Sequence, residues 1–158
     1  MGEERTIALS RCGRFVACRS ESGLDLVDAL GTSPRRHLEL DPIDFAYVGT
    51  MLWVLARGTG EIQRYAADGM RSLSPAIQVG AGARRILPSA GDRAVTALVT
   101  GERDLVVHGF GNEVSVVAID ATGALFPLGG RTLLAAAGAE LRVVDAVRAP
   151  HLNEEGSA

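Results

Sequence analysis

The chain has 158 residues, a hydrophobic content of 47% and a net charge of −3 at neutral pH. This length and hydrophobicity allow one compact domain with a sizeable core and exclude a disordered chain. The negative charge argues against nucleic acid as the main partner, because phosphate binding needs a basic surface. All 16 basic residues are arginine, which is typical of a GC-rich bacterial genome and excludes a P-loop lysine and Schiff-base catalysis.

Four similar units follow one another, each with a short strand, a polar or glycine turn and a second, more apolar strand. The first strands are expected at residues 7–9, 45–48, 86–88 and 125–127, and the second strands at 15–18, 52–55, 94–99 and 133–136. Aligning Phe15, Leu52, Ala94 and Leu133 gives steps of 37, 42 and 39 residues. This period is in the range of propeller blades. The alanine-rich stretch 133–139 also leaves a helix open there.

The second half of each unit carries an alternating strand that ends near an aspartate. These strands are expected at residues 24–28, 62–65, 114–120 and 141–145. Alternation of apolar and polar residues over 4–8 positions is typical of a half-buried strand. The closing aspartates suit turns, because an aspartate side chain bonds its own backbone. The prediction is therefore an all-β fold.

Two stretches carry a resemblance to a known class. The segment IALSRCGRFVA, followed by GLDLVDALG, resembles a blade of the WD40/YVTN β-propeller class, and LPSAGDRAVTALV repeats the pattern. The resemblance covers most of residues 6–146 and implies about four propeller blades. The Gly-His and Trp-Asp pairs of true WD40 repeats are missing, so the YVTN-like description fits better.

The four units are unequal in length. The third carries residues 104–110, which are expected to form an additional strand or a long hairpin, and the fourth is expected to lack its outermost strand. Residues 1–148 are predicted to form the propeller-like domain and residues 149–158 a polar, flexible tail. Either the N-terminal residues supply the missing strand and close a ring, or an open arc pairs its edges with another chain.

Acidic residues are the first candidates for chemistry. The repeated aspartates could converge on a cation, but turn aspartates are expected at equivalent positions of any repeat; they are Asp28, Asp68, Asp120 and Asp145. A metal-dependent enzyme of the lactonase type would need inward-facing acids, for which Glu61, Glu113 and Glu140 are the other candidates. No metal or cofactor ligand is assigned.

Nucleophiles and basic residues give weaker signals. Ser10, Ser89 and Ser115 have no nucleophile elbow and share no local motif with a histidine. His108 alternates with apolar residues, which is more typical of a structural than of a catalytic histidine, so no catalytic residue is assigned. The glycines at 80, 82, 109 and 111 lack a dinucleotide-binding context. The pairs Arg35-Arg36 and Arg84-Arg85 are interpreted as solvated arginines, with a patch for an acidic partner as the alternative.

Cysteine usage and hydropathy indicate the compartment. Cys12 and Cys18 have too few neighbours for a zinc site, and the apolar residues around Cys18 favour a buried free thiol. No apolar stretch approaches the roughly 18 residues of a membrane span. The aromatic residues, which are most simply core, are Phe15, Phe45, Tyr47 and Trp53. We expect a cytoplasmic protein that binds neither membrane nor nucleic acid.

The predicted function is a non-enzymatic protein-interaction or scaffold module, a subunit of a larger assembly. Repeated β units offer a rigid surface and loops. The partner would be another protein or a second copy, held through unpaired β edges. The alternative is a metal-dependent, lactonase-like or ligand-binding propeller.

Overall fold

A computed structural model describes residues 5–88, 95–101, 104–110, 113–119, 125–129, 132–137 and 140–145. The described chain contains strands and turns only, in four antiparallel sheets that are each built from consecutive strands. The first sheet holds β1 (Ile7–Leu9), β2 (Phe15–Ser20), β3 (Gly23–Asp28) and β4 (Arg36–Glu39). The second holds β5 (Pro42–Val48), β6 (Met51–Ala56), β7 (Glu61–Ala66) and β8 (Ser72–Gln78). The third holds β9 (Arg85–Pro88), β10 (Val95–Thr100), β11 (Asp104–Phe110) and β12 (Glu113–Ile119), and the fourth β13 (Leu125–Gly129), β14 (Thr132–Ala137) and β15 (Glu140–Asp145).

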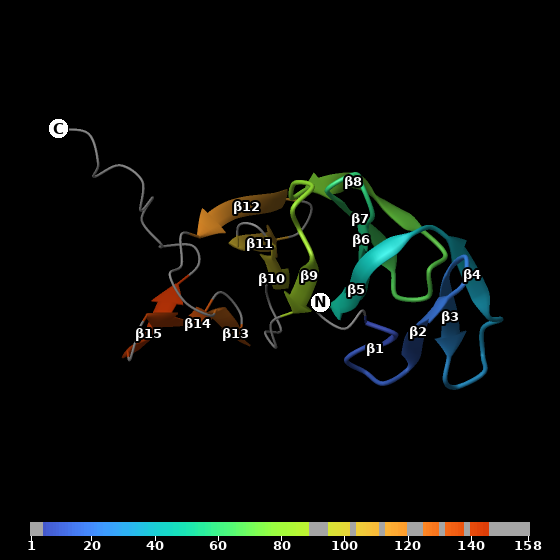
Figure 1. Ribbon diagram of the computed structural model, residues 1–158. Helices are drawn as coiled ribbons and strands as arrows, with labels where there is room; N and C mark the ends of the chain where they lie inside the picture. The colour runs from blue at the N-terminus through green and yellow to red at the C-terminus, as the bar shows by residue number, and fades with distance from the viewer. Residues whose placement is uncertain are drawn as a thin grey trace.

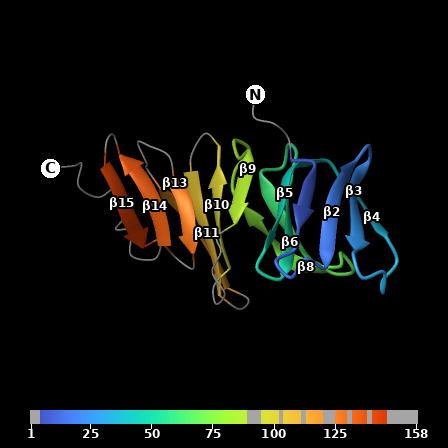
Figure 2. The ribbon, with the colours of Figure 1, turned by 90° about the horizontal axis from the view of Figure 1, so that it is seen from below.

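The sheets follow one another along an open arc (Figure 1), with the first and fourth sheets at its opposite ends. Each sheet contacts its sequence neighbours mainly through its first strands, because β5 lies against both β1 and β9, and β13 lies against β9 and β10. Figure 2 shows the same order from another side, with β4 at one end of the row and β15 at the other. This is the arrangement of propeller blades around an axis.

The predicted all-β fold and its repeat are confirmed. Three of the four positions aligned in the sequence, Phe15, Leu52 and Leu133, lie in the second strand of their sheets, and Ala94 lies outside the described residues. Residues 132–137 form a strand, β14, so the helix left open there does not occur. Its register with both β13 and β15 supplies the hydrogen bonds that a helix would have made internally.

The third unit needs a correction. Residues 104–110 are not an addition, because they form β11, the regular third strand of a four-stranded sheet. Residues 113–119, which were aligned with the third strands of the other units, form the outermost strand β12. Both segments alternate in the same way, so alternation alone could not tell the third strand from the fourth.

The fourth sheet has three strands among the described residues, and the residues after Asp145, where an outermost strand would follow, lie outside them. The N-terminal strand does not complete it, because β1 pairs with β2 at the other end of the arc. The boundary predicted at residues 148–149 and the tail that follows it lie outside the described residues.

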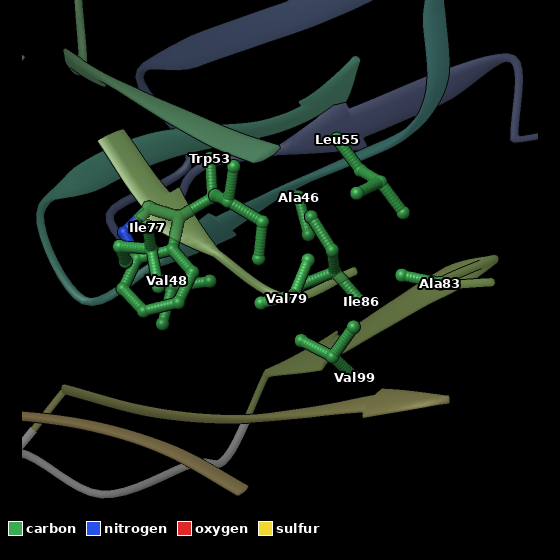
Figure 3. Close-up of a cluster of buried hydrophobic side chains, with 10 residues drawn as sticks. Ala46, Val48, Trp53, Leu55, Ile77, Val79, Ala83, Ile86 and Val99 are labelled. Atoms are coloured by element: carbon green, nitrogen blue, oxygen red, sulfur yellow. The ribbon is translucent and has the colours of Figure 1, made fainter. Parts of the chain in front are cut away.

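The core lies between the sheets, in two clusters. One cluster joins the first and second sheets and contains Phe45, Tyr47 and Leu52, with Phe15 partly buried against it. The other joins the second and third sheets and contains the fully buried Trp53 of the second sheet together with Ile86 and Val99 of the third (Figure 3). The aromatic residues predicted as core therefore lie in these two clusters or pack against them.

Candidate functional site

Asp28 is committed to a structural role. It ends β3, and its side chain accepts hydrogen bonds from Arg14 Nε (3.1 Å) and Nη2 (2.9 Å), Thr32 Oγ1 (2.6 Å) and the Leu30 backbone (3.0 Å). The Arg14 guanidinium, followed by Thr32, holds the pKa of Asp28 far below its usual range. These bonds fix the turn that leaves β3 and occupy the oxygens that a cation would need.

The other predicted acids do not gather around one point. Asp68 accepts a bond from the Met70 backbone in the turn after β7, and Glu61 accepts one from the Gln78 amide in the same sheet. Asp145 ends β15, and Glu113 and Glu140 begin β12 and β15, while Asp120 lies outside the described residues. Within the part of the chain that the structure describes, no three histidine, cysteine or acidic residues form a group suited to a metal.

Of the candidate nucleophiles, Ser115 lies in register with the candidate histidine, whereas Ser10 lies in another sheet. Ser10 is buried in the β1–β2 turn, where its Oγ accepts the Phe15 N–H at 2.8 Å. His108 lies in β11, in register with Thr96 on one side and Ser115 on the other. Ser89 lies outside the described residues. The described geometry thus places Ser10 and His108 in different sheets.

A hollow of about 590 Å³ opens where the first and second sheets meet. The β1–β2 and β5–β6 turns line it, with Cys12, Phe15 and Ala67 among the residues on its wall. The hydrogen bond from Ser10 lowers the pKa of the exposed Cys12 thiol. Both cysteines are free, but the predicted burial is wrong: Cys12 is exposed and Cys18 is half-buried.

The two arginine pairs do not form one patch. Arg35 makes an ion pair with Asp25 just before β4, the outermost strand of the first sheet. Arg84 and Arg85 are exposed at the start of β9, the innermost strand of the third sheet. The two pairs therefore lie beside strands on opposite sides of their sheets.

The first sheet exposes an apolar surface that the sequence analysis did not identify. On one face it carries five side chains, defined here as the free face: Ile7, Leu9, Val16, Cys18 and Val27. Ile7, Leu9 and Val27 are 59%, 60% and 38% exposed, although all three lie in strands that pair within the sheet. The opposite face of the sheet, with Ala8 and Ala17, is buried against the second sheet.

The free face matches a surface that is covered elsewhere in the chain. In the second sheet, the side that packs on the first sheet carries Phe45, Tyr47, Leu52, Val54 and Tyr65. Each of these residues occupies the position in the second sheet that one free-face residue occupies in the first, in the same order. Phe45, for example, corresponds to Ile7. In the second sheet Phe45 and Leu52 are fully buried. The free face is therefore a sheet-packing surface with no described sheet on it.

Polar groups border the free face at its outer end. Asp25 lies in register between Cys18 and His37. Its carboxylate contacts Arg35 and the His37 Nδ1 (2.9 Å), and the bond from Arg35, more than that from His37, lowers the pKa of Asp25. An apolar centre with a charged rim is the usual composition of a protein–protein interface.

The inner end of the free face is held by a buried polar tie. Arg5, two residues before Ile7, places its Nε 3.1 Å from Asp44 Oδ1 and donates from Nη2 to the Ile86 carbonyl at 3.1 Å. Asp44 Oδ2 accepts the Ile86 N–H at 2.7 Å. Desolvation raises the pKa of the Asp44 carboxyl. One carboxylate thereby links the first three sheets and fixes the position of β1.

No helix that is long and apolar enough to cross a membrane occurs among the described residues. Neither the protein-family models nor the curated proteins compared with this chain match it.

Solved structures do match. The WD40 domain of SCAP from fission yeast superposes with a TM-score of 0.66 at 16% identity, over 92% of this chain and 40% of that one. Hsv2 from Kluyveromyces lactis gives a TM-score of 0.58 at 9% identity, over 89% of this chain and 49% of that one. The chain thus spans less than half the length of the structures it matches. It has the architecture of a WD40-like β-propeller, present as an open arc of four blades.

Proposed function

We propose that the protein is a non-enzymatic interaction module, a subunit of a larger assembly, which binds a β sheet of another polypeptide on its free face. The observation that carries this proposal is the exposure of Ile7 and Leu9 at positions whose equivalents, Phe45 and Tyr47, are buried between sheets. Leaving such a surface in water costs about 25 cal/mol per Å² of apolar area. A partner sheet would remove that cost.

The free face is a better docking surface than the described outer edges of the first two sheets. The edge strand β4 has four residues and carries Arg36, His37 and Glu39, and β8 contains Pro75. Short, charged or proline-containing edge strands oppose pairing with another chain. The expected partner surface is therefore a sheet face with small and aliphatic side chains, of the kind that Ala8, Ala17 and Leu24 present to the second sheet.

The candidate chemical groups support a binding role over catalysis. Asp28 and Ser10 are engaged in turn-fixing hydrogen bonds, and the described acids lie in separate places. The two free thiols fit the cytoplasm, where thiols stay reduced, and we propose that location.

In-cell photo-crosslinking tests this function. A benzophenone amino acid at position 9 should yield adducts with a partner protein, because Leu9 is the most exposed side chain of the free face. Met70, which is equally exposed at 61% but lies in the turn after β7, is the matched control and should yield none. Equal adducts from both positions, or none from position 9, would contradict the proposal.

A further inference from the structure

We propose that the occupant of the free face is the fourth sheet of a second copy of this chain, so that two copies join head to tail. This inference rests on the proposed function and names its partner. It starts from the sense in which the sheets pack. In each described contact, a sheet presents one face to the sheet before it and the opposite face to the sheet after it, as the two clusters around Phe45 and Trp53 show for the second sheet.

This sense determines what can cover the free face. The free face points away from the second sheet and is the kind of face that a sheet presents to the sheet before it. It can therefore be covered by the opposite kind of face, which a sheet presents to the sheet after it. Among the described residues, the fourth sheet has a neighbouring sheet only toward the third (Figure 1). Each chain therefore carries one surface of each type, at opposite ends of the arc.

Such a head-to-tail contact either closes into a ring or continues into a filament. An arc of four sheets whose first and last members lie far apart, as Figures 1 and 2 show, needs a second arc to close. Two arcs give eight blades, which is within the range of four to eight that propellers use. The matched solved chains, of which this chain spans 40% and 49%, are also more than twice as long as the matched region.

Light scattering of the full chain over a concentration series is the first test. The expected mass is twice the 16.5 kDa of one chain. Leu9→Arg places a charge at the most exposed side chain of the free face and should weaken association about tenfold or more, as for a residue that the interface buries. Met70→Arg introduces the same charge at the same exposure outside the free face and should leave the dimer intact.

Cys18 provides a second readout that needs no disruptive variant. It lies on the free face, whereas the exposed Cys12 lies in the hollow and serves as an internal reference. In the dimer, alkylation of Cys18 should slow relative to Cys12, and dilution should restore it. A photoreactive cross-linker on Cys18 of a Cys12→Ser variant, mixed with isotope-labelled protein, should join it to residues 125–145 of the second copy.

Three results would overturn the head-to-tail dimer: a monomer at every concentration, a mass unchanged by Leu9→Arg, or cross-links from Cys18 to residues 7–28 of the second copy. A monomer that still gives position-9 adducts in cells would remove this inference and keep the interaction function. A monomer without such adducts would remove both.

Discussion

Replacing Asp44 tests whether the polar tie holds the arc together. Asp44→Ala leaves the buried Ile86 N–H without its acceptor, which costs about 1–3 kcal/mol. It also removes the ion-pair partner of Arg5, which contributes less because the Arg5 side chain is 22% exposed and screened by water. The expected loss of unfolding free energy is about 3 kcal/mol. Asp44→Asn keeps an oxygen for Ile86 and should cost about 1 kcal/mol.

Urea unfolding followed by fluorescence measures these changes. Trp53 is the only tryptophan and is fully buried between the second and third sheets, so it reports on the tie directly. With a slope of about 2 kcal/mol per M, the alanine variant should unfold at about 1.5 M less urea. The reasoning is refuted if Asp44→Ala changes stability by less than about 0.5 kcal/mol, or if Asn and Ala cost the same.

Three further predictions use other described contacts. The pKa of Asp28 is lowered, so the stability that its carboxylate contributes is present at neutral pH and is lost as the pH falls below about 4. The difference in unfolding free energy between wild type and Asp28→Asn, measured by urea unfolding, should therefore narrow from pH 7 to pH 3. A constant difference would contradict this. A Cβ on Gly60 (φ +65°) would lie 2.4 Å from the Gly80 carbonyl carbon, whereas one on Gly58 (φ +79°) meets nothing within 4 Å. Gly58→Ala should cost about 1–2 kcal/mol from backbone strain alone, and Gly60→Ala clearly more in thermal unfolding; equal losses would show that the clash is relieved. Finally, Ser10→Ala should slow alkylation of Cys12 at pH 7.5, because the Ser10 bond is the main cause of its lowered pKa; an unchanged rate would assign the reactivity to another group.

The repeat could be predicted from the sequence because it depends on local pattern. The second strand β6 (MLWVLA) is apolar on both faces, since it packs between two sheets, and it stands out from the turns around it. The outermost strands β4 and β8 were not located, because an edge strand carries charge and proline and resembles a loop. The alignment of the third unit was shifted by one strand for another reason, because β11 and its edge strand β12 alternate in the same way.

The free face could not be predicted, for a different physical reason. Ile7, Ala8 and Leu9 are all apolar, so the sequence does not show which face of this strand has a neighbour. Ile7 and Leu9 appear as ordinary core residues until the order of the sheets along the arc is known. Asp44 was missed similarly, because its partners lie 39 residues before it and 42 after it, outside any local motif.

Sheets that contact only their neighbours along a chain behave as a linear array, in which stability is a sum of units and nearest-neighbour couplings. In such an array the end units are the first to open, and amide hydrogen exchange would rise from the second sheet toward the ends. The bond from Arg5 to the carbonyl of Ile86 breaks that simple rule, because it skips one unit and joins the first sheet to the third. Fraying of the first sheet must therefore also release a contact two units away. The arc is thus expected to open more cooperatively at its N-terminal end than its linear order would suggest.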